Sequence, residues 1–195
     1  MSESDPFDLA FALYIRDATG LTGPHGDELA VARLEGPVPP WRADVSVTFR
    51  DRLAEQWERW WAELLARRSD DVREPENGPS GWVDAPDFAG SAGEPELQRV
   101  QRELFPDAHR WRGVRRPRLD PADLDRHLAP TRLVAELERG IGRPARAFSF
   151  AVETLPLDGG LVRDLSPTRL LVDQRLTTEP GAYVEVLRPR LARLV

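Results

Sequence analysis

The chain has 195 residues, a formal net charge of −6 and no cysteine, and 41% of its residues are hydrophobic. These values predict a globular protein that buries its core as a single domain over residues 1–195, and they exclude disulfides, a thiolate nucleophile and cysteine metal sites. We expect a cytoplasmic protein without a membrane span, because MSESDPFDLA lacks the pattern of a secretory signal and no apolar run reaches the about 18 residues that a membrane helix needs.

Residues 6–19 are predicted to form the first helix. Asp5 can cap the helix, Pro6 suits its first position and Gly20 can end it. The apolar residues of this stretch also alternate as in a strand, but the capping signals and the Ala/Leu content favour the helix. Residues 20–40 are rich in Gly and Pro, which indicates a loop around one short element, a strand at 28–34.

A second, more strongly amphipathic helix is predicted over residues 48–68. Its apolar residues recur at helical spacings, at Phe49, Leu53, Trp57, Trp60, Trp61, Leu64 and Leu65. Thr48 and Asp51 resemble a capping box at its start. Trp60 and Trp61 point about 100° apart, so both are buried only if the helix is covered on more than one side. A core role is favoured for them, and an exposed indole would instead anchor a binding partner.

A long acidic connection, at about 69–94, follows this helix. It is rich in Gly, Pro and Asp, and it indicates a possible boundary between 1–68 and 95–195. Helices are then predicted at residues 95–104, 121–128 and 131–139 from proline and aspartate at first-turn and cap positions and from a glycine stop.

The C-terminal third alternates apolar and polar residues in three runs, around 148–152, 161–165 and 169–173. Gly and Pro lie between the runs, a pattern typical of a small three-stranded antiparallel meander. A C-terminal helix from about Pro180 would place Tyr183, Leu187, Leu191 and Leu194 on one face. The expected fold class is therefore α+β, with a mostly helical N-terminal portion, the meander and the closing helix.

The segment HRWRGVRRPR, residues 109–118, concentrates positive charge in an acidic chain. Residues 1–98 carry 20 acids and 9 arginines, whereas the remaining residues carry 13 acids and 18 arginines. Gly113 and the step to Pro117 predict an extended or turning segment here. We expect it to bind a partner protein or an anion, through Arg110, Trp111, Arg112, Arg115, Arg116 and Arg118. The alternative is that the acidic stretch 69–96, or the acidic N-terminal half, neutralises these arginines within the molecule.

A spacing suited to catalysis or metal binding occurs at Asp120, Asp123 and His127, although helix capping explains the same residues. The chain lacks the recurring motifs for nucleotide, zinc-protease or serine-hydrolase chemistry, and we expect no cofactor and no metal. The leading prediction is a non-enzymatic protein that binds another protein, as an adaptor, regulator or accessory subunit. The alternatives are a nucleic-acid-binding protein that uses residues 110–118, and a small enzyme with a dispersed site near Asp123 and His127.

Overall fold

The computed structural model describes residues 1–24, 26–69, 85–115 and 124–195, with the backbone alone at 115 and 124–127. The chain divides into two compact units: a helical unit, Pro6–Arg116, and a sheet unit, which combines Met1–Asp5 with Pro117–Val195. The helical unit is thus inserted between the first strand of the sheet unit and the rest of it. The α+β class is confirmed, while the single domain stays a prediction.

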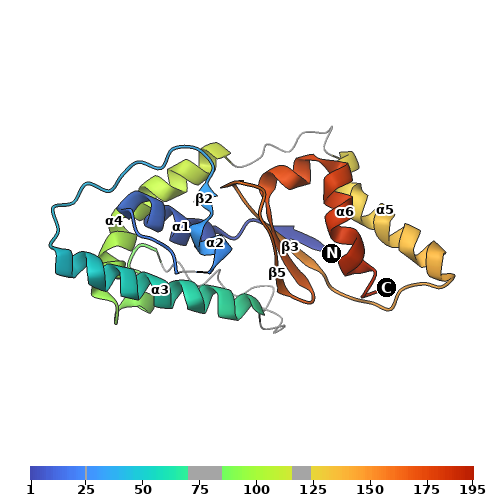
Figure 1. Cartoon of the computed structure of the whole chain (residues 1–195), viewed down its shortest axis with the longest axis horizontal. Helices are drawn as coiled ribbons and strands as arrows, with labels where there is room; N and C mark the ends of the chain where they lie inside the picture. The colour runs from blue at the N-terminus through green and yellow to red at the C-terminus, as the bar shows by residue number, and fades with distance from the viewer. Residues whose placement is uncertain (25, 70–84, 116–123) are drawn as a thin grey trace. The chain divides into compact units, whose positions relative to one another are not determined.

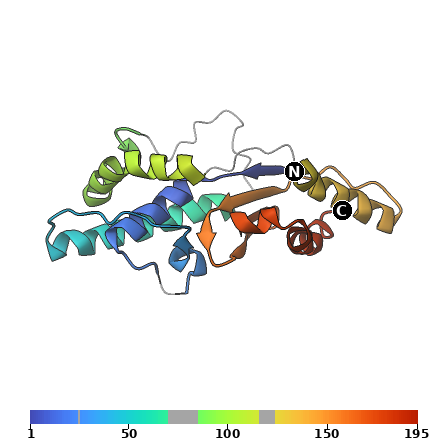
Figure 2. The same ribbon diagram turned by 90° about the horizontal axis from the view of Figure 1, so that it is seen from above.

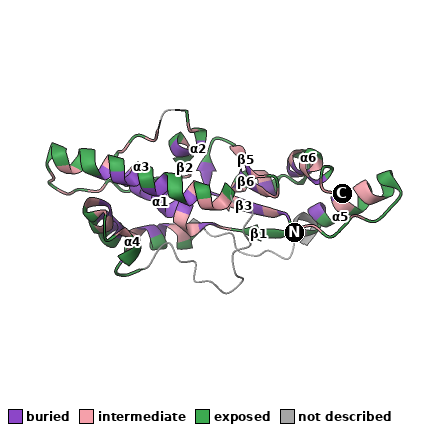
Figure 3. Cartoon of the chain, turned by 90° about the horizontal axis from the view of Figure 1, so that it is seen from below, coloured by how far each residue is buried: buried purple, intermediate pink, exposed green. Residues whose placement is uncertain are grey.

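The helical unit is organised around one central helix. Its elements are α1 (Phe7–Thr19), α2 (Glu28–Val31), β2 (Arg33–Leu34), α3 (Val47–Ser69), the 3₁₀ turn η1 (Ala89–Ser91) and α4 (Pro95–Arg115). Helices α1, α3 and α4 pack against one another (Figure 1). Every residue from Leu9 to Ile15 is buried, so α1 fills the middle of the unit (Figure 3). The helices predicted at 6–19 and 48–68 are confirmed.

The ends of these helices differ in part from the sequence-based expectation. Helix α1 ends as predicted at Gly20, whose φ of 72° suits glycine and whose N–H donates to the Arg16 carbonyl. The capping box expected at Thr48 is wrong, because α3 begins one residue earlier and the Phe49 N–H donates to Ser46 Oγ at 3.2 Å. The strand expected at 28–34 is mostly wrong, since Asp27 caps the short helix α2 there.

Helix α4 is held at its start by a glutamine of α3. The buried Gln56 accepts a hydrogen bond from the Leu97 N–H at 2.8 Å and donates to Glu96 Oε2 at 2.6 Å. The amide of Gln56 is the main reason that the pKa of Glu96 lies below its usual value. One side chain therefore satisfies a backbone donor of the first turn and fixes α4 against α3.

The sheet unit contains one mixed four-stranded sheet. Its elements are β1 (Ser2–Ser4), α5 (Leu124–Ile141), β3 (Ala151–Leu155), β4 (Leu157–Asp158), β5 (Val162–Ser166), β6 (Arg169–Asp173), η3 (Gln174–Thr178) and α6 (Pro180–Leu191). The strand order is β1-β3-β6-β5. Strand β3 is parallel to both β1 and β6, and only β5 and β6 form an antiparallel pair.

The predicted antiparallel meander is therefore wrong in its pairing, although its three strands exist. Only the last two runs form a hairpin, around the turn at Pro167 and Thr168. The first run instead lies on the far side of β6, and the N-terminal strand β1 extends the sheet beyond it (Figure 2). Alternation of apolar residues fixes which face of a strand is buried but does not select the neighbouring strand.

Helices α5 and α6 contact each other and cover a common core with the sheet. Tyr183 and Leu187 of α6 are fully buried there, as predicted, and the Tyr183 hydroxyl donates to Glu3 Oε1 of strand β1 at 2.8 Å. Helix α5 runs through Pro130, so the two helices expected at 121–128 and 131–139 are one. No helix in the part of the chain that the structure describes is long and apolar enough to span a membrane.

Candidate functional sites

The arginine segment 109–118 begins on a helix. Residues up to Arg115 belong to α4, so the extended conformation predicted for this part is wrong. Gly113 lowers helix stability by only about 1 kcal/mol relative to alanine, which buried neighbours on the same helix can offset. Arg116 and Arg118 lie outside the described residues, and so does the side chain of Arg115.

Three of the six residues predicted to bind in this segment have described side chains, and these point to different surroundings. Trp111 is buried, with its ring centroid 5.7 Å from that of Tyr14. The guanidinium carbon of Arg112 lies 4.7 Å from the centroid of the Phe7 ring, a cation–π distance. The side chain of Arg110 is 75% exposed and pairs with Asp107 at 3.2 Å. Arg110 and Arg112 therefore flank an indole that is part of the core.

The surface beside Arg112 is aromatic. Phe7 of α1 meets Phe105 and His109 of α4 edge to face, with both centroid distances 5.9 Å. This cluster holds Arg112 over the Phe7 ring at the boundary between core and solvent. Val114, one turn beyond Arg110, is 80% exposed. We call the exposed side chains of Arg110 and Val114 the α4 surface.

The first half of α4 is electrostatically different, because its two arginines are balanced by two glutamates, Glu96 and Glu103. Arg99 donates to Glu103 Oε1 at 2.9 Å, and Arg102 donates to the Asp87 carbonyl. Burial raises the pKa of Glu103, but the hydrogen bonds from Arg99 and Trp41 outweigh it and leave that pKa lowered. The excess of positive charge on α4 thus lies after Pro106.

The tryptophans of α3 lie in the core. Trp60 is 8% exposed and Trp61 is 1% exposed. Trp61 stacks on Trp57 at 5.5 Å, and its indole N–H donates to Asp27 Oδ2 at 3.0 Å. Helices on two sides cover α3, which is the condition for both indoles to be buried. The structure favours the core interpretation, and the exposed partner anchor considered for Trp60 and Trp61 is not formed.

The structure does not place the side chains that were considered for an enzyme site. Asp120 and Asp123 lie outside the described residues, as does the side chain of His127. Among the residues that are described, no cluster of three or more His, Asp or Glu side chains is arranged to hold a metal ion.

A hollow in the helical unit was not predicted from the sequence. It has a volume of about 600 Å³ and lies beside the C-terminal end of α1. We call it the α1 hollow; its walls are residues 20–23 on one side and the segment 31–38 on the other, and Arg16 and Asp17 form its floor.

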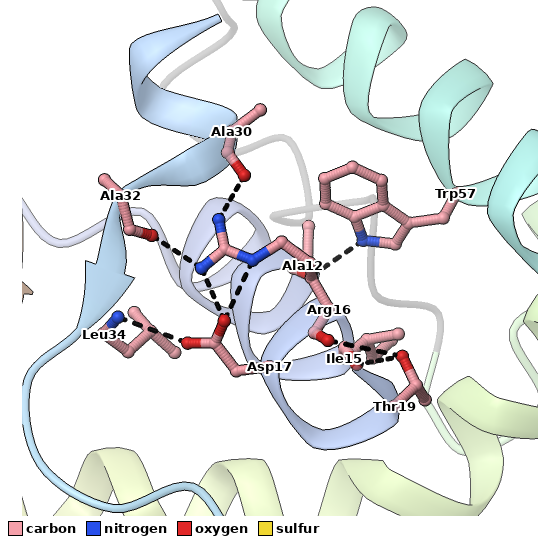
Figure 4. Close-up of polar contacts among 9 residues, drawn as sticks. All are labelled: Ala12, Ile15, Arg16, Asp17, Thr19, Ala30, Ala32, Leu34 and Trp57. Carbon is pink, nitrogen blue, oxygen red and sulfur yellow. Dashed lines mark hydrogen bonds and ion pairs between the residues drawn. The ribbon is translucent and has the colours of Figure 1, made fainter. Parts of the chain in front are cut away.

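The floor of the α1 hollow contains a buried arginine, Arg16, whose guanidinium donates to two backbone carbonyls and to Asp17 (Figure 4). Arg16 is 3% exposed; it donates to the carbonyls of Ala30 and Ala32 and, through Nε and Nη2, to Asp17 Oδ1. The other carboxylate oxygen of Asp17 accepts from the Leu34 N–H at 3.3 Å. Arg16 and Asp17 thus tie α1 to the segment 30–34.

One sequence signal could have located this floor. Arg16 and Asp17 are adjacent opposite charges that directly follow a long apolar run and precede the helix stop at Gly20. A charge on the continuation of a buried helix face must find hydrogen-bonding partners. The identity of these partners, the carbonyls of Ala30 and Ala32 and the N–H of Leu34, depends on a loop path that the sequence does not specify.

Comparison with protein families, with characterised proteins and with solved structures found no match to this chain.

Proposed function

We propose that the chain is a non-enzymatic protein that binds an acidic segment of a partner protein through the α4 surface. The observation that carries the proposal is the exposure of Arg110 and Val114 one helical turn apart, at positions i and i+4 of the same face. A cation beside an exposed aliphatic side chain suits an acidic segment that also carries an apolar residue.

Arg110 also suits a carboxylate, because arginine presents its donors in a planar fork that matches one. Its pair with Asp107, at 3.2 Å, is exposed, and such a surface pair contributes little to stability and can exchange for a carboxylate of the partner. Arg112 lies on another side of the helix, over the Phe7 ring, and is not part of the α4 surface.

Nucleic-acid binding is less well supported by the described residues. That hypothesis used Trp111 as a stacking platform for a base, and the indole is buried against Tyr14. The acidic net charge of the chain also repels phosphate at long range.

The test is a pull-down from host lysate with the tagged protein, its variant Arg110→Glu/Val114→Asp and the control Arg146→Glu, each with and without nuclease. Arg146 is an exposed arginine of the sheet unit. We expect a stoichiometric protein that survives nuclease and is lost only with the α4 variant. With that protein purified, calorimetry should show affinity reduced more than about tenfold by the α4 variant and unchanged by the control.

Two results would contradict the proposal. A partner retained equally by all three proteins would show that the α4 surface is not the interface. Material that disappears with nuclease, with a binding constant that falls steeply with salt, would indicate nucleic-acid binding instead.

A further inference from the structure

Both walls of the α1 hollow are held by hydrogen bonds. The Leu21 N–H donates to the Arg16 carbonyl, which fixes the first wall to the end of α1. Gly23 packs so closely that a Cβ there would collide with the Ala30 carbonyl. The second wall is held by Arg16 and Asp17 through Ala32 and Leu34. Such a hollow needs little rearrangement to accept a ligand.

The charge available inside the hollow is that of one arginine. Arg16 and Asp17 neutralise each other at the floor, at 2.6 Å. Arg33, on the second wall, makes no ion pair or side-chain hydrogen bond with any of the residues that the structure describes. The hydroxyl of Thr22 on the opposite wall likewise has no described partner. One cation and one hydroxyl are thus left to bind a ligand.

The rest of the lining is largely aliphatic. Val31 is 57% exposed although it faces the same hollow as the buried Leu34, and Leu21 and Val38 complete the apolar walls. Exposed aliphatic surface in a concave site gains free energy when an apolar ligand covers it.

We propose that the α1 hollow binds a small apolar ligand that carries a single carboxylate. The carboxylate pairs with Arg33, and the hydrocarbon part covers Val31 and the neighbouring aliphatic side chains. A nucleotide or other polyanion fits the site less well, because Arg33 is the one lining cation that is not already neutralised. The volume of about 600 Å³ suits a ligand of about ten heavy atoms or more.

The test uses octanoate as the probe, with octanol and octylammonium as probes of equal chain length and different charge. The ¹⁵N-labelled full chain is titrated with each, and amide shifts are followed. We expect octanoate to bind most tightly and to shift the amides of residues 20–23, 31–36 and 38. Arg33→Gln should weaken octanoate about tenfold and change octanol binding less than about twofold.

The matched control is Arg42→Gln. Arg42 is another exposed arginine without a described partner, and it does not line the hollow. It should leave octanoate binding unchanged, whereas Val31→Asp should weaken it. The proposal is overturned if octanoate causes no shifts at millimolar concentration, if the shifts map to another part of the chain, or if Arg33→Gln and Arg42→Gln have equal effects. Amide spectra of the unliganded variants distinguish loss of binding from loss of fold.

Discussion

Replacing Arg16 by methionine should destabilise the helical unit strongly. The substitution keeps an unbranched apolar stem but removes the guanidinium donors to Asp17 and to the carbonyls of Ala30 and Ala32. Breaking a buried ion pair by removing one partner costs about 3–5 kcal/mol. The Asp17 side chain is 20% exposed, so water partly replaces its lost donors and the pair alone should contribute near the lower end. With the two carbonyls included, we expect a loss of about 3–5 kcal/mol in the free energy of unfolding.

Tryptophan fluorescence during urea unfolding measures this loss selectively, because all six tryptophans of the chain lie between residues 41 and 111, within the helical unit. Arg42→Gln is the control and should change stability by less than about 0.5 kcal/mol. Adding Asp17→Leu to Arg16→Met should recover part of the loss, since the unpaired carboxylate is then gone. A loss below about 1 kcal/mol for Arg16→Met would refute the argument that these contacts hold α1 to residues 30–34.

Three further predictions concern single polar side chains. Gln101 is buried and its amide has no hydrogen-bond partner within the described residues, so Gln101→Met should raise the unfolding free energy by about 1–2 kcal/mol in urea titrations. The pKa of Glu96 is lowered in the folded state. Ionised Glu96 therefore contributes its full stabilisation above the ordinary glutamate pKa of about 4.3, and this contribution is lost as the pH falls through the pKa of the folded state. Gln56→Met removes the main cause of the lowered pKa, so it should flatten the loss of stability between about pH 5 and pH 3. Tyr183→Phe removes the bond to Glu3 and should cost about 1 kcal/mol and speed amide exchange in β3, whereas Glu3→Gln, which keeps an acceptor, should cost less.

The helices of the chain were more predictable than its sheet. The segment 48–68 has enough apolar residues at helical spacing to specify α3 within a residue at each end. The end of α4 was missed because Gly113 and Pro106 are local signals against a helix, while the burial of Leu104, Ala108 and Trp111 along one face supports it. Tertiary burial outweighed local propensity at this point.

Pairing between distant strands could not be predicted in the same way. The sequence SES of strand β1 carries no apolar pattern, and its place in the sheet depends on β3. In the candidate sites, too, some features are visible in the sequence and others are set by packing. The arginines of α4 were visible as a cluster, but the burial of Trp111 between them and the α1 hollow both depend on packing against other elements.

The sheet unit combines two separate segments, Met1–Asp5 and Pro117–Val195, and this constrains the order in which the protein folds during synthesis. The ribosome delivers Ser2–Ser4 first, then the whole of Pro6–Arg116, and Ala151–Leu155, the partner of the first strand, much later. The helical unit is continuous and can fold as it emerges, whereas β1 stays unpaired until β3 has been synthesised. A slow translation step placed after Arg116 would therefore separate the two folding events, with the N-terminal strand joining in the second.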